Sequence, residues 1–209
     1  ALAAFADAVA AAEAVRGRFR SEEFKSGFFG TAQDILDDAV DAAFDARDFA
    51  LALDYSERSR SRALLDLLVG RVAPADGGLT FVDRVAPAVP LATLRQSLPR
   101  DAAVVVYHVL KARTLAWVLR PGELRAVAIP QGREQLGDQV SGLLEEIRED
   151  APASRPRLSA LHAALVAPLG LKPGEAMLAV AHDALYMLPF GALGDGKTAL
   201  IEDRAVAML

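Results

Sequence analysis

The sequence predicts a mixed α/β fold in which a helical region precedes a sheet-containing region. Residues 103–110 (AVVVYHVL) are rich in β-branched side chains, and residues 176–181 (AMLAVA) are apolar without alternation. A short unbroken apolar run is typical of a strand buried on both faces, as in the middle of a parallel sheet. Helical spacing of apolar residues dominates the first 70 residues and returns between the two strand regions.

The chain opens on a predicted helix and a predicted linker. Leu2, Phe5 and Val9 recur at helical spacing, and the helix is expected to end near Gly17. Residues 18–30 (RFRSEEFKSGFFG) predict a linker with phenylalanine anchors, in which Gly30 breaks the chain before the next helix.

Two further helices are predicted over residues 31–46 and 48–69, joined by a tight corner at Ala46 and Arg47. Such a pair is typical of a tetratricopeptide-type hairpin, although no second copy follows at a period of about 34 residues. The buried stripe of the first helix is predicted to be Leu36, Val40, Ala43 and Phe44, whereas its aspartates at positions 34, 37, 38, 41 and 45 share another side. We interpret these aspartates as a solvated face; a metal-binding cluster is the alternative.

Charged residues also step along the last of these helices. Asp54, Arg58, Arg62 and Asp66 recur every four residues and therefore lie on one face. The simplest interpretation is an outer face lined by ion pairs. The alternative is an arginine-lined recognition groove, which makes Arg58 and Arg62 the candidate partner-binding residues.

Residues 71–100 are rich in proline and glycine, so they predict a linker, with a short helix over 89–98. Strands are then expected over 103–110, 115–119 and 124–129. Pro121 and Gly122 fill the central places of a type II turn, which makes the three strands an antiparallel meander. His108 falls in the first strand, where a part-buried structural histidine is expected.

Two helices follow the meander, over 133–150 and from Pro156 onward, and each carries a leucine-rich inward stripe. His162 flanks the second stripe and is expected to cap or pack. The strand over 176–181 ends at His182 and Asp183, where its chain reaches the surface. Pro189 disfavours helix at Leu188, so an extended turn should fold Phe190 back onto the core.

Three stretches resemble the CHAT domain, a caspase-like domain found behind tetratricopeptide-type helices. They are the helix FFGTAQDILDDAVDAAF, the helix YSERSRSRALLDLL, and the strand followed by Leu-x-x-Leu-Pro-Phe-x-x-Leu at 185–193. ALIEDRAVAML resembles the segment that comes next in that family. The resemblance spans residues 19–209 and implies a helical region over 1–70, a linker over 71–100, and the first half of a caspase-like sheet domain over 101–209.

The resemblance implies a cysteine endopeptidase with a His–Cys dyad that is controlled by its helical region through a protein partner. The family carries that dyad on loops after strands that lie beyond residue 209, and this chain has no cysteine. His182 does not match the family's catalytic histidine, so no catalytic residue is assigned and the fragment itself is not expected to catalyse hydrolysis. A non-catalytic interaction module with a degenerate caspase-like fold is the alternative.

Residues 191–198 (GALGDGKT) match the phosphate-loop pattern, in which Lys197 would contact phosphates and Thr198 magnesium. Such a loop follows a buried strand directly, whereas about ten residues separate the two here. Residues 199–209 also read as extended chain rather than as a helix. We therefore expect a surface turn, with nucleotide binding as a third hypothesis and no cofactor or metal assigned.

The composition of the chain limits the classes of function and partner that remain. The chain has 209 residues, is 53% hydrophobic, and carries a formal net charge of −5 without a long basic block, which argues against nucleic acid as a partner. No apolar stretch reaches the roughly 20 residues that span a bilayer, and the start lacks the features of a signal peptide. Both ends look cut from a longer protein, and the cytoplasm is the expected compartment.

Overall fold

The computed structural model describes residues 2–16, 22–71, 96, 98–149 and 154–209. The chain divides into two compact units, Ala1–Leu91 and Ala92–Leu209, which are described separately below. Most of the predicted linker, including all of its short helix except Gln96 and Leu98, lies outside the described residues. Within the described part, no helix is both long and apolar enough to cross a bilayer.

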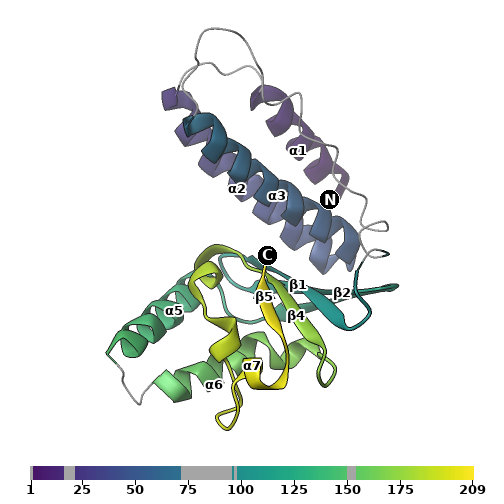
Figure 1. The fold of residues 1–209 in the computed structure, drawn as a ribbon. Coiled ribbons are helices and arrows are strands. Elements are labelled where there is room, and N and C mark those ends of the chain that lie inside the picture. Colours follow the sequence, from purple (N-terminus) through teal and green to yellow (C-terminus); the bar gives the residue numbers. More distant parts are fainter. Residues whose placement is uncertain (1, 17–21, 72–95, 97, 150–153) are drawn as a thin grey trace. The chain divides into compact units, whose positions relative to one another are not determined.

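The first unit contains three helices, α1 (Leu2–Arg16), α2 (Glu22–Asp45) and α3 (Phe49–Arg71), and α2 packs against both of the others (Figure 1). The predicted linker over 18–30 is wrong from Glu22 onward, because α2 passes through Gly27 and Gly30 without a break. An interior glycine costs a helix only about 1 kcal/mol relative to alanine, so a long helix can absorb two of them.

The corner between α2 and α3 lies at Ala46 and Arg47, as predicted, and it has the form of a Schellman motif. The N–H of Asp48 donates to the carbonyl of Ala43 at 3.0 Å, and that of Arg47 donates to Phe44 at 2.9 Å. Arg47 takes the left-handed position of the motif, with φ of 61°. The carboxylate of Asp48 then accepts the N–H of Leu51 at 3.1 Å and caps the start of α3.

The predicted stripe of α2 is confirmed, since Leu36, Val40, Ala43 and Phe44 are all buried. The ring of Phe44 lies 5.0 Å from that of Phe49 across the corner. Three of the α2 aspartates are exposed and the other two are half-buried, and no group of potential metal ligands occurs among the described residues. The face is therefore largely solvated, as expected.

The second unit is built on a five-stranded mixed sheet in the order β3-β2-β1-β4-β5. Its strands are β1 (Ala102–Val109), β2 (Thr114–Arg120), β3 (Glu123–Ile129), β4 (Ala176–Val180) and β5 (Val206–Met208). The first three form the predicted antiparallel meander, and Gly122 has the positive φ, 76°, that a type II turn requires at that place. β4 and β5 add to β1 in parallel.

Helices α5 (Arg133–Arg148) and α6 (Ser154–Leu165) connect the meander to β4 and lie beside each other (Figure 1). They share one buried cluster with the sheet, to which β1 contributes Ala103, Val105, Tyr107 and Val109. The α5 stripe is confirmed except at its end, where Ile147 is 43% exposed in the last turn.

Strand β4 lies between β1 and β5, as predicted for a central parallel strand, but only one of its faces is fully buried. Met177 and Ala179 have no exposed surface, whereas Leu178 and Val180 are half-buried. The prediction of burial on both faces is therefore wrong for this strand. The strand has no polar residues because its second face, which carries Leu178 and Val180, is still partly covered.

The turn after β4 has the predicted form. A short 3₁₀ helix, η3 (Asp183–Met187), leads to Leu188, whose backbone is extended. Phe190 is buried, and its ring stacks on that of Tyr107 with 5.5 Å between the ring centres. The Tyr107 hydroxyl donates to the carbonyl of Leu165 at 2.9 Å, and burial raises the pKa of that hydroxyl.

The last segment differs from the prediction of extended chain. After η4 (Phe190–Ala192), one helical turn, α7 (Leu200–Asp203), precedes the short strand β5. The side chain of Glu202 accepts the N–H of Ala199 at 3.0 Å, which closes this turn. Leu200 is buried in the same cluster as Phe190. This helical turn is thus associated with the burial of a single leucine, which is too little for a helical pattern in the sequence.

Candidate functional site

The carboxyl ends of β1 and β4 bring two histidines together. His108 is near the end of β1 and His182 is the second residue after β4, so 74 positions of sequence separate residues that become neighbours. Their imidazole rings stack, with 4.5 Å between ring centres and 11° between ring planes. His108 is fully buried and His182 is half-buried. The carboxyl edge of parallel strands is the usual place for binding groups in an α/β sheet.

His182 is fixed by the backbone of β1. Its Nδ1 accepts the N–H of Val109 at 3.0 Å. A nitrogen that accepts a hydrogen bond must carry a lone pair, so the proton of the neutral ring is on Nε2. His182 is thus bonded to backbone at the point where the predicted strand ends.

An ion pair continues this cluster onto the start of α5. The guanidinium Nε of Arg133 lies 2.7 Å from a carboxylate oxygen of Asp183, and Arg133 Nη2 donates to the carbonyl of Val109 at 3.3 Å. Asp183 has a φ of 55°, and its other carboxylate oxygen accepts the N–H of Ala184. Asparagine and aspartate are the non-glycine residues that tolerate this left-handed conformation best. We call His108, His182, Asp183 and Arg133 the carboxyl-edge cluster.

The chemistry of the carboxyl-edge cluster is limited to imidazole, guanidinium and carboxylate groups. The Nδ1 lone pair of His182 is used on the backbone, so that nitrogen cannot serve as a general base in this arrangement. The cluster has no thiol, because the chain has no cysteine. Its arrangement positions a turn against a strand, and it does not form a nucleophile–base pair.

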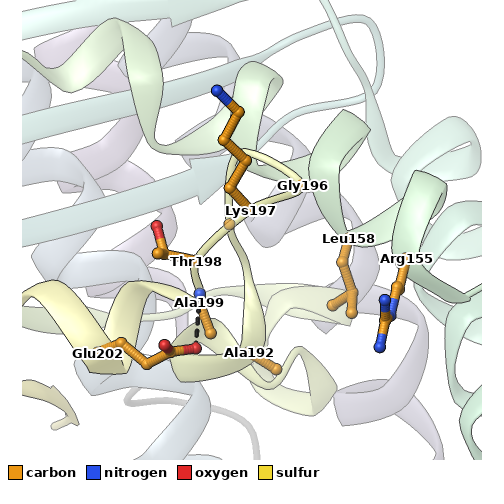
Figure 2. Close-up of a pocket in the computed structure, with 9 residues that line it drawn as sticks. Arg155, Leu158, Ala192, Gly196, Lys197, Thr198, Ala199 and Glu202 are labelled. Carbon is orange, nitrogen blue, oxygen red and sulfur yellow. Dashed lines mark hydrogen bonds between the residues drawn. The ribbon is translucent and has the colours of Figure 1, made fainter.

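The phosphate-loop pattern lies on a surface turn beside an open pocket of about 270 Å³ (Figure 2). The N–H groups of Lys197 and Thr198 donate to the side chain of Asp195 at 2.9 and 3.1 Å. These bonds lower the pKa of the Asp195 carboxyl. Two of the amides that a phosphate loop needs are thus bound to a carboxylate of the loop itself.

The cations near this pocket do not converge. In Figure 2, the side chains of Lys197 and Arg155 extend in different directions. The helix that follows is α7, which has four residues and begins after Ala199. The geometry gives no support to nucleotide binding here and fits the expected Gly-Asp-Gly surface turn.

Arg58, one of the two candidate partner-binding residues, is about half exposed on α3 and pairs with Asp54 at 2.9 Å. Its guanidinium also lies 5.9 Å from the ring centre of Tyr55. This is the predicted ion-paired outer face, with its arginine still accessible from solvent. Arg62 belongs to the backbone of α3, but its side chain lies outside the described residues.

Arg120 and Glu175 form a buried ion pair that was not predicted from the sequence. Arg120 ends β2 and Glu175 precedes β4, so the pair lies at the opposite edge of the sheet from the histidines. Arg120 also donates to the carbonyl of Gly170, and Arg125 donates to that of Leu169. The two residues are 55 positions apart in the sequence, and a local sequence pattern cannot predict an ion pair over that separation.

No protein-family model matches this chain, and no curated protein sequence matches it either. By its fold, the chain belongs to the class of proteins that contain a helical unit followed by a unit with a mixed sheet and helices. A function for this chain is therefore proposed from its residues and their arrangement alone.

Proposed function

We propose that residues 101–209 form the first half of a CHAT-type, caspase-like peptidase domain and that residues 1–70 form its tetratricopeptide-like regulatory region. The chain then provides scaffold and regulatory surface, since without a cysteine it has no thiol nucleophile. A protein or peptide partner that binds the helices would shift the peptidase half between inactive and active states. Arg58 and Arg62 are the residues proposed to contact that partner.

The observation that carries the proposal is the way the sheet grows along the chain. In chain order, the meander of β1, β2 and β3 comes first and two helices follow. β4 and β5 come next and extend the sheet in parallel on the free side of β1. A sheet that grows in this direction presents the carboxyl ends of its parallel strands at one edge. The dyad of a caspase-like enzyme belongs on loops at such an edge.

The reading frame beyond the codon for Leu209 tests this proposal. We expect a histidine after the next strand-like run and a cysteine after the one that follows. The purified natural protein should then react with a thiol-directed peptidyl ketone, and replacement of that cysteine by serine should abolish the labelling. A frame that encodes neither residue overturns the peptidase proposal.

The second candidate is a non-catalytic docking module with a degenerate caspase-like fold. It is favoured by the exposed apolar surface of η3, where Tyr186 is 53% and Met187 is 63% exposed. Such side chains are typical of protein contact surfaces. Absence of both dyad residues from the natural protein, together with retained partner binding, would favour this candidate over the first.

A further inference from the structure

The side chain of His182 takes the place of a missing strand residue beside β1. The parallel ladder between β1 and β4 ends at Val106 and Val180, where β4 leaves the sheet. Three residues further along β1, the N–H of Val109 still needs an acceptor, and the Nδ1 of His182 provides it at 3.0 Å. A titratable ring thus completes the hydrogen bonding of a sheet strand.

This hydrogen bond exists only while the Nδ1 of His182 is unprotonated. A neutral imidazole has one donor and one acceptor, whereas a protonated imidazole has two donors and no acceptor. Proton uptake at Nδ1 would set an N–H against the N–H of Val109. The bond would be lost, and the two donors would repel each other.

Charged and titratable groups surround this bond on three elements. His108 of β1 stacks on the His182 ring, Arg133 of α5 donates to the Val109 carbonyl, and Asp183 of η3 pairs with Arg133. The charge of Arg133 is balanced by Asp183, so the pair adds little net charge beside the ring. His108 is fully buried whereas His182 is half-buried, so His182 is the ring that solvent reaches.

The turn that His182 holds contains a candidate hinge. Asp183 follows directly and has a left-handed φ of 55°. Asp183 is also the first residue of η3, in which the Leu185 N–H donates to the His182 carbonyl at 3.2 Å and Tyr186 and Met187 are exposed to solvent. Leu185 in the middle of η3 is fully buried, so release of His182 would loosen only the start of this turn from β1.

We propose that His182 is a proton-operated latch between the end of β1 and the turn Asp183–Met187. The neutral ring holds the start of the turn against β1, and the protonated ring releases that attachment, while buried Leu185 stays in the core. The latch is independent of the proposed peptidase function, because it is defined by residues 108–187 alone. In a peptidase or in a docking module, it would make the attachment of this turn to β1 depend on pH.

The test is an NMR titration of the intact 209-residue chain from about pH 8 to pH 5, the range in which histidine ordinarily titrates. As the pH falls, the imidazole nitrogen signals of His182 should change from the Nε2–H tautomer to the protonated ring. Over the same transition, the Val109 amide signal should shift, and its protection against hydrogen exchange should fall about tenfold, as for loss of one hydrogen bond. A Val109 amide whose shift and protection are constant while His182 protonates overturns the latch.

The matched variant is His182→Asn, in which the side-chain oxygen can accept the Val109 N–H but cannot titrate. Its Val109 amide should keep the same shift and protection over the whole range. His108→Phe keeps a stacked ring and should leave the wild-type transition in place. A transition that persists in His182→Asn, or that disappears in His108→Phe while His182 still titrates, assigns the effect to another group and contradicts the proposal.

Discussion

Arg120 and Glu175 form a bidentate ion pair in which both side chains are almost completely buried. The Nε of Arg120 lies 2.6 Å from one carboxylate oxygen of Glu175, and its Nη2 lies 2.8 Å from the other. Only 6% and 5% of the two side chains are exposed. The second Glu175 oxygen also accepts the N–H of Lys172, so the pair fastens the loop before β4 to the end of β2.

We therefore expect Glu175→Gln to destabilise the sheet unit by about 3 kcal/mol at neutral pH, because it leaves the buried guanidinium with only the half-exposed carboxylate of Glu123, 3.2 Å away, as its counter-charge. The double variant Arg120→Met/Glu175→Leu should lose less than the single variant, since apolar side chains leave no uncompensated charge. Urea unfolding curves measure both losses. Equal stability of Glu175→Gln and wild type would show that the pair contributes nothing.

The same pair predicts an acid dependence. The hydrogen bond from Arg120 lowers the pKa of Glu175. A carboxyl whose folded pKa is depressed stabilises the fold above its unfolded pKa, about 4.3, and this contribution is lost as the pH falls through the lower folded pKa. Wild type should thus lose stability below about pH 4 more steeply than Glu175→Gln does. Parallel pH profiles of the two proteins would contradict this prediction.

Arg47→Gly should stabilise the helical unit by about 0.5–1 kcal/mol, because glycine adopts the left-handed position of the corner without steric strain. Arg47 is exposed and has a φ of 61°. Arg47→Ala is the control, since alanine keeps the strain and should give no gain. Denaturation followed by helical circular dichroism measures the change, and an equal gain for both variants would rule out backbone strain as the cause.

Phe190→Ala should cost the sheet unit about 3–5 kcal/mol, because it removes a fully buried ring from its stack on Tyr107. Phe190→Leu should cost less, since it leaves a smaller cavity. Tyr186→Ala, in the neighbouring exposed turn, should change stability by no more than about 0.5 kcal/mol. Thermal unfolding of the three variants checks the order, and a small effect of Phe190→Ala would show that the proline turn does not anchor the core.

The intact chain should not be retained on immobilised ATP, and Lys197→Ala should behave in the same way. The reason is that Asp195 already occupies the Lys197 and Thr198 amides. ATP-agarose chromatography with magnesium gives the answer. Retention that Lys197→Ala abolishes would revive the phosphate-loop hypothesis.

The sequence predicts the features that depend on local periodicity and turn chemistry. The meander follows from β-branched runs around Pro121-Gly122, and the burial of Phe190 follows from the restriction that Pro189 imposes. Local rules fail where tertiary packing overrides them. Gly30 lies inside α2 instead of ending a linker, and one turn of helix interrupts the extended chain before β5.

The candidate site could be predicted only in part. The sequence shows His182 as a polar break after an apolar strand, but it does not show which group the ring bonds. Its partner His108 could not be paired with it from sequence, because the parallel register of β1 and β4 decides which residues meet. The pair of Arg120 with Glu175 was missed for the same reason: its partners come together only when the sheet forms.

The structure of the natural protein is the decisive measurement for the proposal that this sheet is the first half of a caspase-like domain. We expect chain beyond Leu209 to add a strand parallel to β5 and to place a histidine and a cysteine at the same edge as His182. A natural protein in which β5 remains the last strand of the sheet, with no histidine and cysteine facing each other at that edge, would contradict it.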